Sequence, residues 1–114
     1  MPSERSFGFL EDILRNIDLA YAFVDGLTYE DFEKDTLRLY GVTRCLEIIS
    51  EASRGLSDEF KSRNPKIVWR EMAGAGNVYR HSYQDIAARR IWETVRLALP
   101  PLRAVIEQEL AQRG

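Results

Sequence analysis

One short segment carries most of the side chains in this sequence that could do chemistry. Within residues 69–83, a glycine-rich stretch flanked by arginines leads to His81, the only histidine, and then to Tyr83. Because the pKa of free histidine lies near neutrality, His81 could give or take a proton under ordinary conditions. Arg70 or Arg80 could bind a phosphate through paired hydrogen bonds. The segment indicates a site for phosphodiester chemistry, and the alternative is a histidine with a surface or structural role.

The charge distribution places a basic segment around this histidine. The chain has a formal net charge of −2. Residues 1–60 hold 13 acidic and 6 basic side chains, whereas residues 61–96 hold 8 basic and 3 acidic ones. A basic segment in an acidic protein can form a local surface that attracts phosphate, or it can be an ordinary solvated helix face.

The sequence offers no ligand set for a metal, and we expect no cofactor. Cys45 is the only cysteine and there is one histidine, so a cluster of zinc ligands cannot be assembled. A single thiol suits a reducing compartment. No apolar run approaches the ~20 residues that span a bilayer, and the N-terminus lacks the pattern of a signal peptide. We therefore expect a cytoplasmic protein without a membrane segment.

Helical periodicity accounts for most of the chain. No stretch alternates apolar and polar residues as a half-buried strand does. Residues 1–114 make a single domain by length, and four long helices with short connections predict an all-α, up-and-down bundle with additional short helical turns. Pro100 and Pro101 are expected to force a turn before the last helix. Apolar residues recur at three- and four-residue spacing over residues 7–25, 35–54, 84–98 and 102–114.

Local signals predict the first two helix boundaries. Gly26 is expected to end the first helix in a left-handed conformation, and Thr28 with Asp31 resembles a capping box that starts a short helical turn. Gly41, inside the second long helix, predicts close approach of a neighbouring helix. The residues expected on the buried face of that helix are Leu37, Tyr40, Cys45, Ile48, Ile49 and Ala52.

The boundaries around the candidate site are predicted from proline, glycine and asparagine. Asn64 followed by Pro65 predicts the start of a short helix. Gly74 and Gly76 are expected to break that helix, and Asn77 is expected to cap the next turn.

The order of these features resembles the HepT-like family of the HEPN superfamily. In that family a short helix with tryptophan leads to the pattern Gly-x-Arg-Asn-x-x-x-His-x-Tyr. Residues 44–52 resemble the family's Arg-x-Leu-x-x-Ile-Gly-Glu-Ala helix, and residues 91–92 and 99–102 resemble its Val-Trp and Leu-Pro-x-Leu. The residues that match the first pattern are Trp69, Gly74, Asn77, His81 and Tyr83.

The resemblance implies a HEPN-like bundle and a metal-independent ribonuclease. Active members are homodimers in which two motifs face one cleft, and the RNA 2′-hydroxyl attacks the adjacent phosphate. Carried over to this sequence, His81 is the acid/base candidate and Asn77 an orienting group as well as a predicted helix cap. Arg44, Glu51 and Arg70 become candidates for lining the cleft, and the alternative for Arg44 and Glu51 is an intrahelical charge pair or solvated side chains.

The sequence departs from the family motif at Gly76, where the family has arginine. Arg80, Arg70 or an arginine from a second subunit could supply the charge instead. Two hypotheses stay open. The chain is the ribonuclease toxin of a type VII toxin–antitoxin pair, or it is a catalytically degenerate HEPN module that binds RNA, a nucleotide or only its protein partner.

Tyr83 has an implied regulatory role. In HepT-like toxins, the tyrosine two residues after the histidine is where a minimal nucleotidyltransferase antitoxin attaches AMP. The added phosphates would repel RNA from the cleft. The alternative is an ordinary half-buried tyrosine.

Overall fold

Eight helical segments make up the part of the chain that the structure describes. The computed structural model describes residues 4–80 and 84–113, with side chains over residues 8–74 and 87–113. This part contains no strand, so the predicted all-α class is confirmed. The segments are α1 (Glu4–Val24), α2 (Tyr29–Lys34), α3 (Thr36–Arg54), α4 (Asp58–Arg63), α5 (Trp69–Arg80), α6 (Gln84–Glu93), the π-helix η1 (Thr94–Ala98) and α7 (Leu99–Arg113).

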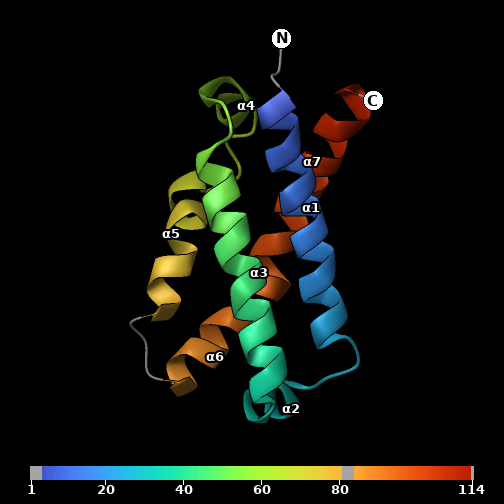
Figure 1. The fold of residues 1–114 in the computed structure, drawn as a ribbon. Helices are drawn as coiled ribbons and strands as arrows, with labels where there is room; N and C mark the ends of the chain where they lie inside the picture. Colours follow the sequence, from blue (N-terminus) through green and yellow to red (C-terminus); the bar gives the residue numbers. More distant parts are fainter. Residues whose placement is uncertain (1–3, 81–83, 114) are drawn as a thin grey trace.

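Helix α3 lies at the centre of the bundle. It packs against α1 on one side and against α5 on the other, and α7 lies against α1 (Figure 1). The short helix α2 packs on α6 at the end of the molecule opposite the two termini. The arrangement makes α3 and α5 immediate neighbours, and these two helices carry most of the predicted site.

The core is built from apolar side chains of every helical segment. Removing each such side chain from water stabilises folding by about 1.5–3 kcal/mol. The apolar periodicity predicted over residues 7–25 is confirmed in α1, because Leu10, Ile13 and Ile17 are fully buried. The largest fully buried side chains from the other helices are Phe32, Leu46, Ile49, Phe60, Ile91, Leu99, Leu102 and Ile106.

The predicted buried face of α3 is partly wrong. Leu37 and Tyr40 are 82% and 68% exposed, and Leu39 and Val42 are buried instead. Leu37 and Tyr40 stand two positions before and one position after Leu39, so the 100° step per residue turns them away from the core. The predicted residues that are buried are Cys45, Ile49 and Ala52.

The predicted cap between α1 and α2 is confirmed. Gly26 has φ +77°. The hydroxyl of Thr28 accepts from the backbone N–H of Asp31 at 3.1 Å, and the carboxylate of Asp31 accepts from the N–H of Thr28 at 3.3 Å. Gly41 also behaves as predicted, because an added Cβ would lie 3.1 Å from the ring of Phe23 on α1.

The predicted helix start at Asn64 is wrong. Asn64 instead ends α4, where its backbone N–H donates to the carbonyl of Lys61 and its side-chain amide donates to that of Phe60 at 2.9 Å. Ser57 caps the start of α4 by accepting from the N–H of Phe60. Pro65 has no N–H with which to extend a helix, so it follows α4 as a stop signal.

The predicted turn at Pro100 and Pro101 is also wrong. The chain stays helical from α6 through η1 into α7, and the N–H of Leu99 donates to the carbonyl of Thr94, five residues earlier. A proline ring crowds the carbonyl four residues before it and offers no N–H. The wider π turn directly before the two prolines relieves this crowding, so both stand in the first turn of α7.

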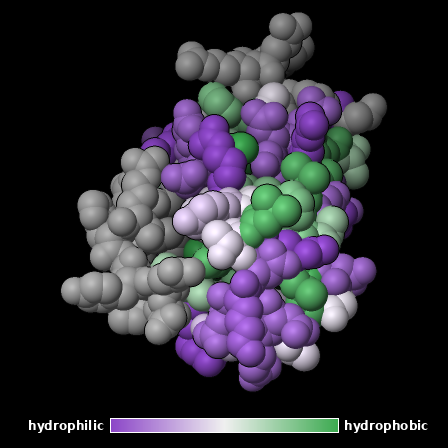
Figure 2. All heavy atoms as spheres, turned by 60° about the horizontal axis from the view of Figure 1, so that its bottom comes forward, coloured by the Kyte–Doolittle hydropathy of each residue, from purple (hydrophilic) through white to green (hydrophobic). Residues whose placement is uncertain are grey.

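The surface mixes polar and apolar side chains. On the face at the lower end of Figure 1, small hydrophobic patches are separated by hydrophilic ones (Figure 2). The large apolar side chains that the structure exposes are Leu19, Leu37, Tyr40, Val68 and Leu97.

A buried carboxylate joins α4 to α7. Glu109 is 7% exposed. It accepts hydrogen bonds from Arg63 at 3.1 and 3.3 Å and from Arg113 at 2.9 Å. The hydrogen bonds from Arg63, and after them those from Arg113, lower the pKa of Glu109. A lowered carboxyl pKa stabilises the folded state above the ordinary glutamate pKa, and this stabilisation is lost as the pH falls through the lowered value.

We expect Glu109→Gln to lower the free energy of unfolding by roughly 1–3 kcal/mol near neutral pH, because it removes the negative charge and replaces one accepting oxygen with an amide donor that faces the guanidinium groups. Urea denaturation at neutral pH and in acid measures the effect, and the difference from the native protein should shrink in acid. Glu59→Gln is the control, because Glu59 contacts the same arginine at 3.8 Å from an 84% exposed position. Equal effects of the two variants would contradict the prediction.

Candidate active site

The predicted site residues that the structure describes lie on two helices that pack against each other. Arg44 and Glu51 are on α3, and Arg70 is near the start of α5. Asn77 and Arg80 belong to α5, and the structure describes the backbone of both but not the side chains. The segment with His81 and Tyr83 lies outside the described residues.

Helix α5 runs without a break through both of its glycines. The predicted break at Gly74 and Gly76 is therefore wrong, and Asn77 lies inside the helix and not at its N-cap. Neither glycine appears among the positive-φ positions of the described chain, where Gly26 is found. A helical glycine costs about 1 kcal/mol relative to alanine. Packing against α3 outweighs this cost, so Asn77 and Arg80 belong to the same continuous helix as Trp69.

We expect Gly74→Ala to raise the free energy of unfolding by about 0.5–1 kcal/mol, because alanine favours a continuous helix. An added Cβ at Gly74 would meet no described atom within 4 Å. Gly41→Ala is the matched control, since its Cβ would press on Phe23 at 3.1 Å. Urea denaturation compares the two variants. A loss of stability in Gly74→Ala would contradict the continuous α5.

A hydrogen-bonded contact fixes α5 against α3. The hydroxyl of Ser50, which is 1% exposed, donates to the carbonyl of Ala73 at 2.6 Å. Nη2 of Arg54 donates to the same carbonyl at 2.6 Å and lies 3.4 Å from the hydroxyl of Ser50. Sequence reasoning missed Arg54. Arg54 follows Ser50 by four residues and so stands on the same face of α3, but this spacing does not show that the face meets α5.

The predicted cleft-lining residues are solvent-exposed. The side chain of Arg44 is 66% exposed, and its Nη1 lies 3.7 Å from Glu47, not from Glu51. Glu51 and Arg70 are also exposed. An ion pair of this kind contributes little to stability. The structure thus leaves these three side chains in contact with solvent, where an added ligand could reach them.

The two tryptophans have structural roles. Nε1 of Trp69 donates to the carbonyls of Lys61 and Asn64 at 3.2 and 3.1 Å, which holds the start of α5 on the end of α4. Trp92 packs on the rings of Tyr29 and Phe32, with centroid separations of 5.9 and 5.3 Å. Both rings are partly buried against the core.

Within residues 4–80 and 84–113, no three His, Cys, Asp or Glu side chains gather as metal ligands would. Cys45 is buried, and burial raises the pKa of its thiol. Among the described helices, none combines the length and apolar character needed to cross a bilayer.

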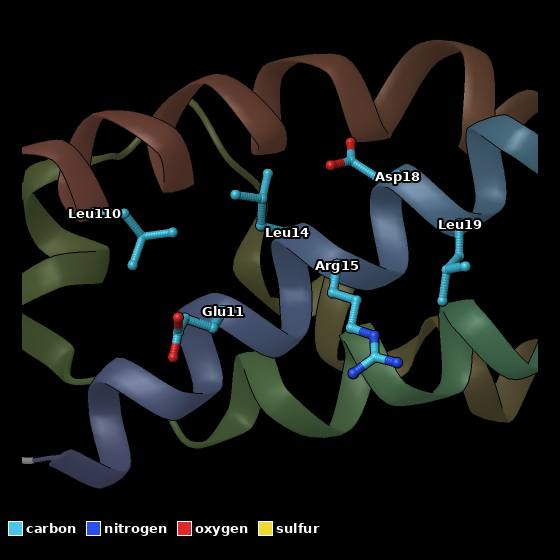
Figure 3. Close-up of a pocket in the computed structure, with 6 residues that line it drawn as sticks. All are labelled: Glu11, Leu14, Arg15, Asp18, Leu19 and Leu110. Carbon is cyan, nitrogen blue, oxygen red and sulfur yellow. The ribbon is translucent and has the colours of Figure 1, made fainter.

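A surface groove lies between α1 and α7 (Figure 3). Its volume is about 480 Å³. No predicted site residue lines it, so the groove belongs to a different pair of helices from the candidate site. The lining residues are Glu11, Leu14, Arg15, Asp18, Leu19 and Leu110.

The region of this chain that is similar to known proteins contains all of the predicted site residues. A family model described as Ribonuclease HepT-like matches residues 13–109. A protein of Thermococcus cleftensis, named "Probable ribonuclease HepT", is 38% identical over 100 residues, which cover 88% of this chain and 91% of that protein. A "Putative RNase" of Caldanaerobacter subterraneus subsp. tengcongensis is 35% identical over 102 residues, with coverage of 90% and 91%. No solved structure matches the chain significantly.

Proposed function

The chain belongs to the Ribonuclease HepT-like family, and from this premise we propose that it is a metal-independent endoribonuclease. The match over residues 13–109 is the observation that carries the proposal, because it contains all of α3 and α5 together with His81. The similar proteins from Thermococcus cleftensis and Caldanaerobacter subterraneus are named as ribonucleases, which supports the same substrate class.

The proposed reaction is transfer of a phosphodiester within RNA. The 2′-oxygen forms a bond to the adjacent phosphorus as its proton leaves, and the bond from phosphorus to the 5′-oxygen breaks as that oxygen gains a proton. His81 serves in this proton transfer, and Asn77 orients the reacting groups. A cation stabilises the charge that develops on the phosphate oxygens. Arg80 and Arg70 are the sequence-based candidates for that cation.

We further propose that the protein acts as the toxin of a toxin–antitoxin pair. Two copies form a homodimer in which the 77–83 segments face one cleft, and a minimal nucleotidyltransferase antitoxin inactivates the toxin by adding AMP to Tyr83. Gly76 favours the alternative of a degenerate module that binds RNA, a nucleotide or its protein partner without cleaving. The cleavage experiment below separates the two.

Incubation of the purified protein with single-stranded RNA in EDTA tests the proposed activity. The expected products end in a cyclic or 3′-phosphate on one side and a 5′-hydroxyl on the other. Mass spectrometry of the fragments identifies these ends. Intact RNA after prolonged incubation, together with RNA binding, would favour the degenerate module. Cleavage that stops in EDTA would contradict the metal-independent mechanism.

A further inference from the structure

We propose that Arg54 of α3 is the cation that contacts the RNA phosphate at this site, an inference that rests on the proposed function. Its guanidinium crosses from α3 to the backbone of α5, where Nη2 donates to the carbonyl of Ala73 at 2.6 Å. A helical carbonyl points toward the residue four positions later, which here is Asn77. The positive charge of Arg54 is therefore held beside the turn of α5 that leads into residues 77–80.

Arg54 differs from several other arginines of this protein in the kind of group that accepts its hydrogen bonds. Its acceptors within the described part of the chain are neutral, namely the carbonyl of Ala73 and the hydroxyl of Ser50. Among the described residues, no carboxylate lies within ion-pair distance of it, whereas several other arginines have such a partner. Those paired arginines are Arg38, Arg44, Arg63, Arg103 and Arg113.

Neutral anchoring leaves the charge of Arg54 available to an anion. The residue is exposed, and within the described part of the chain its Nε and Nη1 donate to no acceptor. Nη2 alone fixes the planar group, so the other donors can form paired hydrogen bonds with a phosphate. A cation that is already in position loses less entropy on binding and stabilises developing charge more effectively.

Ser50 also contacts the carbonyl and the guanidinium of this contact. Its hydroxyl is almost completely buried and is held by Ala73, and it lies 3.4 Å from Nη2 of Arg54. Gly76 offers no charge on α5 itself. Arg54 brings a guanidinium to the same helix from α3, so the charge reaches the site from outside the motif.

The test compares Arg54→Gln with Arg54→Lys. Glutamine keeps an N–H donor for Ala73 but removes the charge, and lysine keeps the charge. Arg38→Gln is the matched control, because Arg38 lies on the same helix but its Nη1 is paired with the carboxylate of Asp35 at 2.8 Å. Two measurements are made on each variant. One is the single-turnover cleavage rate with single-stranded RNA, and the other is the affinity for 2′-O-methyl RNA, which cannot be cleaved, as a function of salt.

We expect Arg54→Gln to cleave about 10²–10³-fold more slowly. The slope of log binding affinity against log salt concentration should become shallower by about 1 for this variant. Arg54→Lys should keep the salt dependence, and Arg38→Gln should behave as the native protein does.

Native binding and cleavage by Arg54→Gln would overturn the inference while leaving His81-dependent cleavage intact. If the native protein does not cleave, the proposed function fails, and the salt dependence of binding alone decides the role of Arg54. Equal losses in both Arg54 variants, accompanied by lower unfolding midpoints, would show a structural role and would also overturn it.

Discussion

Replacing His81 with alanine is expected to slow RNA cleavage by about 10²–10⁴-fold, the range that a positioned acid or base contributes. The imidazole is the only group of its kind in the chain, so no second histidine can take over the proton transfer. Single-turnover rates on the same RNA, with native protein in parallel, measure the change.

Added imidazole should restore part of the activity of His81→Ala, because the free base can enter the vacated space. Circular dichroism confirms that the variant is folded. Cleavage by His81→Ala at the native rate would remove His81 from the mechanism.

AMP addition is expected to occur on Tyr83 and to be abolished completely when this tyrosine is replaced. Incubation with ATP and the partner nucleotidyltransferase should add one or more AMP units, visible as a gain in intact mass. The phosphates should also suppress RNA cleavage by repelling the substrate. Three arginines lie near in sequence and could pair with the added phosphate, namely Arg80, Arg89 and Arg90.

Tyr83→Phe should gain no mass under the same conditions. Tyr79→Phe is the control, because it removes a neighbouring phenol from the same segment and should be labelled normally. Labelling of Tyr83→Phe to the native extent would place the modification elsewhere. This prediction does not depend on an arginine at position 76.

Local signals in the sequence predicted the fold well where one interaction dominates. Gly26 and the Thr28–Asp31 capping box end and restart helices as expected, because each depends only on neighbouring residues. The apolar stripe of α1 is equally clear, since Leu10, Ile13 and the rest of its face have no competing arrangement.

Predictions failed where two signals competed. Asn64 can cap either end of a helix, and Ser57 decided the choice by starting α4 earlier. Gly74 is compatible with a break or with a helix, and packing against α3 decided for the helix. Pro100 marks a turn in isolation, yet the π turn before it lets the helix continue.

The candidate site was predicted as a sequence segment and not as a three-dimensional arrangement. His81 and Tyr83 remain predictions, because they lie outside the described residues. Arg54 was missed because it is 19 residues from Ala73, and only the packing of α3 on α5 brings the two together. Contacts between helices decide which arginine faces the site, and spacing along one helix does not report them.

In the proposed mechanism, the RNA 2′-hydroxyl is the attacking group. The most direct test of this mechanism is the single-turnover rate on an RNA that carries one 2′-deoxy residue at a mapped cleavage site. We predict that cleavage at that position disappears while cleavage at unmodified positions continues at the native rate. Cleavage at the deoxy position with an unchanged rate would contradict the mechanism, because the attacking oxygen would then have to come from another source.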